Sequence, residues 1–85
     1  MNDTQRILNR VCRMASGETR GEVTRAVIGE AVSISALLGR LGGGDVQGEV
    51  DNLIRHGVLQ KSGGTVSLTE AGWRAIMADR GILIR

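Results

Sequence analysis

One segment constrains the fold of this chain more than any other, because it reverses direction between two helical patterns. Residues 50–76 read VDNLIRHGVLQKSGGTVSLTEAGWRAI. Within this segment, VLQK and TVSL have alternating apolar residues and are separated by SGG, which predicts a β-hairpin across residues 58–68. Amphipathic helical patterns lie before and after the hairpin. The chain must therefore pack helices against a small antiparallel sheet.

The two helices that flank this hairpin have clear end signals. The first is predicted over residues 46–56 and stops before Gly57, at a position where a left-handed residue is favoured. The second is predicted over residues 69–79. Thr69 is placed to cap it, and Glu70 lies in its first turn, where a negative charge is favourable.

Two more helices are predicted upstream. One covers residues 4–15, where apolar residues recur at helical spacing. The other covers residues 34–41, with Ser33 or Ser35 as its cap and with Leu37 and Leu41 expected to be buried. It cannot continue through the three consecutive glycines that follow. This helix, the glycine turn and the helix at 46–56 together make a helix-turn-helix unit.

Residues 18–32 carry mixed signals. Thr19 and Glu22 form a possible capping box, after which Val23, Ala26, Val27 and Ile28 could form an inward stripe. The β-branched residues also allow a short strand near Val32. We predict a helix for this segment, with the strand as the alternative.

The composition limits how stable such a fold can be. The chain has 85 residues, no Phe, no Tyr and one Trp, so aliphatic side chains must build the core. This length predicts a single domain over residues 1–85. A small aliphatic core, together with the apolar residues at 82–84, leads us to expect a homodimer. No apolar run approaches the roughly 20 residues that span a bilayer. No signal-peptide pattern follows Met1, so a soluble cytoplasmic protein without membrane contact is expected.

Three single residues are predicted to have structural roles. Cys12 lies in a helical pattern and is expected to be a buried thiol. His56 precedes Gly57 at a helix end, where a hydrogen-bond donor is favourable. Trp73 is expected to pack over the hairpin or at a dimer seam. The glycine-rich stretch GRLGGGDV lacks the Lys-Ser/Thr ending of a phosphate-binding loop. We therefore expect no enzymatic activity, no cofactor and no metal.

The order helix, glycine turn, helix, hairpin and helix is that of a winged helix-turn-helix, mainly α with a small β-hairpin. The segments VDNLIRHGVLQK and VSLTEAGWRAI resemble the recognition helix, wing and following helix of the multiple-antibiotic-resistance-regulator (MarR) type of transcriptional regulator. SISALLGRLGGGDV resembles the first helix and turn of the same unit. The resemblance covers about residues 33–77 and implies a DNA-binding regulator.

The resemblance further implies that the helix at 45–56 enters the major groove of double-stranded DNA and that the 61–65 loop touches the flanking backbone. Gln47, Gly48 and Asn52 lie off the apolar stripe and are candidates to face bases. Gln and Asn can each make a two-point contact with adenine. The matching positions also give candidate phosphate contacts, which are Ser35, Arg40, Arg55, Lys61, Ser62 and Thr65.

The charge pattern keeps a second class of function open. The net charge is +2, which permits nucleic-acid binding without demanding it. The proposed recognition helix carries Asp45, Glu49 and Asp51. Asp45 can cap the helix, but Glu49 facing phosphates would oppose DNA binding. An acidic patch around Glu49 and Asp51 would favour a winged-helix protein–protein interaction module that does not bind DNA.

Overall fold

The computed structural model describes residues 3–16, 25–42 and 46–79. The order is α1 (Asp3–Ala15), a single 3₁₀ turn η1 (Arg25–Val27), β1 (Val32–Ser33), α2 (Ile34–Leu41), α3 (Val46–Arg55), β2 (Leu59–Ser62), β3 (Thr65–Leu68) and α4 (Glu70–Asp79). Four of the five predicted helices, those over residues 4–15, 34–41, 46–56 and 69–79, and the predicted hairpin are confirmed, each to within one residue at either end.

The strands form one antiparallel sheet in the order β1-β3-β2. Val32 pairs with Val66, and Leu59 pairs with Leu68, so the central strand lines the core with alternate apolar residues. The tight reversal between β2 and β3 uses Gly63, whose φ of 58° suits a residue without a Cβ atom. With the helices around it, this sheet completes a winged helix-turn-helix arrangement.

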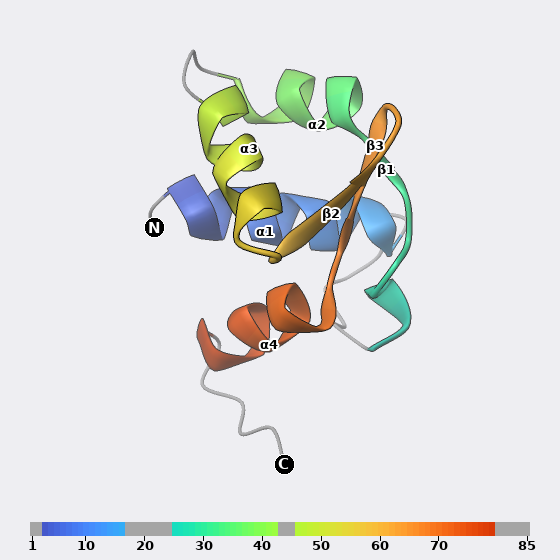
Figure 1. The fold of residues 1–85 in the computed structure, drawn as a ribbon, viewed down its shortest axis with the longest axis vertical. Helices are drawn as coiled ribbons and strands as arrows, with labels where there is room; N and C mark the ends of the chain where they lie inside the picture. Colours follow the sequence, from blue (N-terminus) through green and yellow to red (C-terminus); the bar gives the residue numbers. More distant parts are fainter. Residues whose placement is uncertain (1–2, 17–24, 43–45, 80–85) are drawn as a thin grey trace.

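Helix α1 lies across the middle of the molecule, with α2 and α3 on one side of it and α4 on the other (Figure 1). It contacts α2, α3, α4, β1 and β3. Its apolar side carries Ile7, Leu8 and Val11, each at most 1% exposed. All other α-helices and strands add to the same core. Its remaining buried members are Cys12, Val27, Val32, Leu37, Val46, Val50, Leu53, Leu59, Val66, Leu68, Trp73, Ile76 and Met77.

The helix ends follow the local signals of the sequence. Ser33 is the cap of α2, because its side chain accepts a hydrogen bond from Ala36 N at 3.3 Å. Gly57 follows α3 with a φ of 77°, as predicted. The Thr69 hydroxyl accepts a hydrogen bond from Gly72 N at 3.1 Å and so caps α4.

The helix predicted over residues 18–32 is wrong where this segment is described. Residues 25–27 make only one 3₁₀ turn, and β1 occupies the position of the alternative strand near Val32. Ile28 bridges to Leu68, and Gly29, with a φ of 85°, donates to Leu68 O at 3.0 Å. The edge of β3 that does not pair with β2 offers these backbone partners. Tertiary pairing therefore overrides the local helical pattern.

Some side-chain predictions also need correction, and others concern residues outside the described part of the chain. Ala26 is exposed rather than inward, and Leu41 is only half-buried at the edge of the core. The predicted caps at Thr19 and Asp45, the predicted inward residue Val23 and the apolar residues at 82–84 lie outside the described residues.

Candidate nucleic-acid interface

Helix α3 has one buried and one outward side. Val46, Val50 and Leu53 are each at most 7% exposed. Successive residues of an α-helix are about 100° apart around its axis. Gly48, Asp51 and Arg55 therefore lie on the opposite side, with Gln47 and Asn52 at its two edges; Asn52 is half-buried, and the other four residues are exposed. The residues predicted to face bases thus fall on the outward side of α3 or at its edge.

Two contacts within α3 involve this outward side. Gln47 Nε2 donates to Asp51 Oδ1 one turn later at 3.4 Å, which is a long and weak hydrogen bond. His56 Nδ1 donates to the backbone oxygen of Asn52 at 2.8 Å. The predicted role of His56 at the helix end is therefore confirmed. Because His56 uses the Asn52 backbone, this bond leaves the Asn52 side-chain amide untouched.

The hairpin turn lies beside the start of α2 (Figure 1). Ile34 N donates to Gly64 O at 2.9 Å, and Thr65 pairs with Ser33 on one side and Ser62 on the other. Of the predicted phosphate-contacting residues, Ser35, Ser62 and Thr65 come together at this end of the molecule. The Thr65 hydroxyl donates to Ser62 O at 2.8 Å and so already has a partner inside the turn.

The cations of the candidate interface come from three elements. Arg40 lies in the last turn of α2, Arg55 ends α3, and Lys61 lies in β2. All three are exposed. Across the described parts of α2, α3 and the hairpin, the only exposed acidic residue is Asp51. The exposed formal charge of these three elements is therefore positive.

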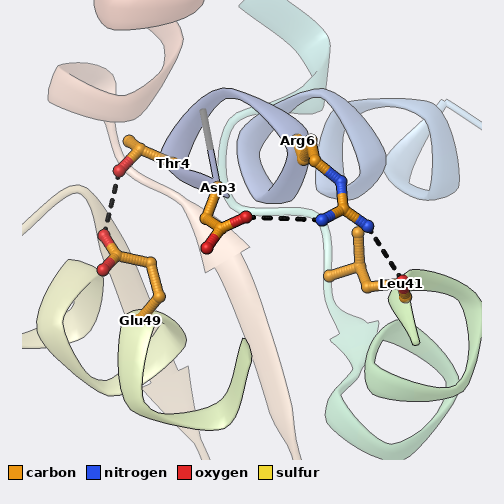
Figure 2. Close-up of polar contacts among 5 residues, drawn as sticks. All are labelled: Asp3, Thr4, Arg6, Leu41 and Glu49. Atoms are coloured by element: carbon orange, nitrogen blue, oxygen red, sulfur yellow. Dashed lines mark hydrogen bonds and ion pairs between the residues drawn. The ribbon is translucent and has the colours of Figure 1, made fainter. Parts of the chain in front are cut away.

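Glu49 does not join the outward side of α3. It is half-buried, and its Oε1 accepts a hydrogen bond from the Thr4 hydroxyl of α1 at 2.9 Å (Figure 2). Asp51, two residues further on, leaves the helix in a different direction and is exposed. The two acids therefore do not share one face, and Glu49 has a structural partner that the sequence analysis did not identify.

The first turn of α1 also contacts α2. Arg6 Nη2 donates to Leu41 O at 2.9 Å, and Arg6 Nη1 pairs with Asp3 Oδ1 at 3.3 Å (Figure 2). The last carbonyls of a helix lack helical partners, so a guanidinium is favourable there. We name the contacts of Asp3, Thr4 and Arg6 the α1 clasp. Its bonds to Leu41 and Glu49 join residues 35 and 45 positions apart, so no local sequence pattern pointed to them.

A second polar cluster lies around α4. Arg25 is hydrogen-bonded and ion-paired to Glu70, and its guanidinium lies 5.0 Å from the centre of the Trp73 ring. Arg74 Nη2 lies 3.6 Å from Glu70 Oε2. The hydrogen bond from Arg25, helped by the nearby positive charges, holds the pKa of Glu70 below its ordinary value. Trp73 is only 9% exposed, so it is a core residue that Arg25 covers.

Comparisons with protein-family models, with curated proteins and with solved structures found no match. Within residues 3–16, 25–42 and 46–79, no group of His, Cys, Asp and Glu side chains is arranged to hold a metal ion. In the same part of the chain, no helix has the length and apolar character needed to cross a membrane. The candidate interface therefore rests on the fold and on the residues of α2, α3 and the hairpin.

Proposed function

We propose that this protein is a sequence-specific DNA-binding regulator that inserts α3 into the major groove and uses the 61–65 loop as its wing. The observation that carries the proposal is the division of polar residues on α3. Gln47, Asn52 and Arg55 lie on the outward side or its edge, whereas Glu49 bonds to Thr4 on α1. The acid that would oppose DNA binding is thus directed away from the proposed contact surface.

The dimensions of the unit support this proposal. Helix α3 has ten residues and is therefore about 15 Å long, and the major groove admits an α-helix. The hairpin turn lies beside the first turn of α2, where the Ser35 hydroxyl is exposed. A helix in the groove with hydroxyls and cations beside it is the usual division between base readout and phosphate contacts. The resemblance to MarR-type regulators leads to the same assignment.

The charges support binding of modest strength. The exposed parts of α2, α3 and the hairpin carry three cations, Arg40, Arg55 and Lys61, and one acid, Asp51. Each cation that neutralises a phosphate releases a counterion, so binding should weaken as salt rises. We further propose that two copies bind one palindromic site as a homodimer, because a two-fold protein matches a two-fold operator. Sedimentation of the complex should then give two chains per duplex.

Selection of binding sites from random duplexes tests the function, followed by fluorescence anisotropy on the selected and scrambled sequences. Asn52→Ala should relax the sequence preference and reduce discrimination by about 1–3 kcal/mol, while non-specific binding is retained. Lys61→Ala should weaken binding to every duplex and reduce the salt slope by about one. Arg74→Ala is the matched control, because it removes one exposed cation from α4, on the far side of α1 (Figure 1).

Two results would contradict this proposal. One is the absence of binding to any duplex at micromolar protein in low salt. The other is an equal loss of binding for Lys61→Ala and Arg74→Ala, which would show that the net charge matters rather than the proposed surface. In the first case the alternative becomes the better explanation, namely a winged-helix module that binds another protein without binding DNA.

A further inference from the structure

The α1 clasp lies where the two helices of the helix-turn-helix unit meet α1. Thr4 and Arg6 belong to the same helical turn, and they reach Glu49 in the first turn of α3 and Leu41 at the end of α2, respectively (Figure 2). Both contacts are made by polar atoms outside the apolar core. They therefore add little to hydrophobic burial. Their effect is to hold the Glu49 side chain and the end of α2 in position.

The Thr4–Glu49 bond fixes a side chain that has other orientations open to it. A glutamate has three rotatable side-chain bonds, and Glu49 is only half-buried. On α3 it directly follows Gly48 and lies one turn before Asn52, both candidate base-facing residues. Among the described residues, the hydrogen-bond partner that holds its carboxylate is the Thr4 hydroxyl, at 2.9 Å. Without that hydroxyl, the carboxylate is free to turn toward the outward side of α3.

We propose that Thr4 is a positioning residue for DNA binding, which acts by holding the negative charge of Glu49 against α1 and away from the DNA phosphates. This inference rests on the proposed function and adds a residue that does not itself touch DNA. Two unit charges about 4 Å apart in water repel by about 1 kcal/mol, which corresponds to about a fivefold change in affinity. One freed carboxylate beside a phosphate is therefore enough for a measurable loss.

The test uses four proteins in anisotropy titrations at low and high salt: wild type, Thr4→Val, Glu49→Gln and the double variant. Valine keeps the shape and the β-branching of threonine and removes only the hydroxyl. Glutamine keeps the acceptor oxygen of Glu49 and removes its charge. We expect Thr4→Val to weaken binding about fivefold at low salt, with a smaller loss at high salt because the repulsion is then screened.

Glu49→Gln alone should stay within about twofold of the wild type, because the wild-type charge is already held aside. The double variant should recover wild-type affinity, since the uncharged side chain no longer repels phosphates. Ser16→Ala is the matched control for deleting a hydroxyl, because the Ser16 hydroxyl bonds to Arg13 O at the other end of α1. This control should bind DNA as the wild type does.

Each alternative outcome has a distinct meaning. If Thr4→Val weakens binding and Glu49→Gln does not rescue it, Thr4 acts through the fold alone and the inference is wrong. If Thr4→Val binds as the wild type does, the hydroxyl does not control the position of Glu49, and the inference is again wrong. If the wild type itself binds no duplex, the proposed function fails and this role of Thr4 fails with it.

Discussion

Helices α1 and α4 are both attached to the rest of the fold near their first turns, but by different kinds of contact. At the start of α4, the Thr69 hydroxyl lies 2.6 Å from Gly57 O and 3.0 Å from Val58 O as a donor and accepts from Gly72 N, so all three partners are backbone atoms. At the start of α1, the side chains of Thr4 and Arg6 reach across to α3 and α2. We name the contacts of Thr69 with Gly57, Val58 and Gly72 the α4 junction. This junction holds backbone atoms in place, whereas the α1 clasp depends on side chains that reach another helix.

The α4 junction also depends on a close approach that only glycine permits. A Cβ atom placed on Gly72 would lie 2.3 Å from Val58 O and 3.0 Å from Leu68 Cδ2. This distance gives the glycine of the LTEAG segment a physical reason, because α4 packs directly on the turn that leads into the hairpin. In the α1 clasp, by contrast, each contact is made by at least one side chain that can adjust. The first junction should therefore be rigid and sensitive to added volume, and the second should be tolerant.

Gly72→Ala is expected to have the largest effect and is the most direct way to break this comparison. Added atoms in a well-packed site force shifts that cost about 1–3 kcal/mol, and here the obstacle is a backbone oxygen rather than a side chain. We expect the free energy of unfolding to fall by about 3 kcal/mol, the upper end of that range. Urea unfolding followed by circular dichroism measures it.

Gly48→Ala is the matched control for that experiment. Gly48 also lies within a helix, but a Cβ atom there would meet nothing within 4 Å. Alanine should therefore stabilise the protein by about 0.5–1 kcal/mol, because it reduces the conformational entropy of the unfolded chain. If the two variants changed stability alike, the contact between α4 and Val58 O would not matter, and the difference between the two junctions would disappear.

Thr69→Ala and Thr4→Val sharpen the comparison with smaller effects. Loss of the Thr69 cap should lower the free energy of unfolding by about 1–2 kcal/mol, since the amide of Gly72 loses its acceptor. Loss of the Thr4 hydroxyl should lower it by about 0.5–1 kcal/mol, the net value of one partly exposed hydrogen bond. Urea titrations at neutral pH measure both changes in the free energy of unfolding. A larger loss for Thr4→Val than for Thr69→Ala would reverse the assignment of rigid and tolerant junctions.

The same difference explains what the sequence could predict. The hairpin, the Gly57 stop and the Thr69 cap are signals within a few residues of each other, and all three are confirmed. The strand at Val32–Ser33 depends on the open edge of β3, more than thirty residues away, and the local helical pattern gave the wrong prediction there. At the candidate site, the outward position of Gly48 and Arg55, with Gln47 at the edge, follows from helical periodicity alone. The partner of Glu49 does not, because only the packing of α1 brings Thr4 to it.

The smallest expected effect concerns the pH dependence of stability that arises from the polar cluster of Arg25, Glu70 and Arg74 around α4. Arg25 holds the pKa of Glu70 below its ordinary value, so the folded state binds a proton there less readily than the unfolded chain does. The resulting stabilisation is complete above the ordinary carboxyl range, about pH 4.3, and is lost as the pH falls through the lowered folded-state pKa. Glu70→Gln should therefore be slightly less stable than the wild type at pH 7, with the difference vanishing in strong acid.

The cause of that lowered pKa can be tested residue by residue, through a carbon-detected NMR titration of the Glu70 carboxyl. Arg25→Met should raise the pKa of Glu70 more than Arg74→Met does, because the hydrogen bond from Arg25 is the largest cause and Arg74 contributes less. Methionine keeps apolar cover over Trp73, so the core beneath should stay intact. Equal shifts in the two variants would mean that general positive charge, rather than the Arg25 bond, sets the pKa. In that case the side chains around Glu70 would make no specific contact that sets its pKa. The backbone contacts of Thr69 and Gly72 would then be the feature that distinguishes the α4 junction from the α1 clasp.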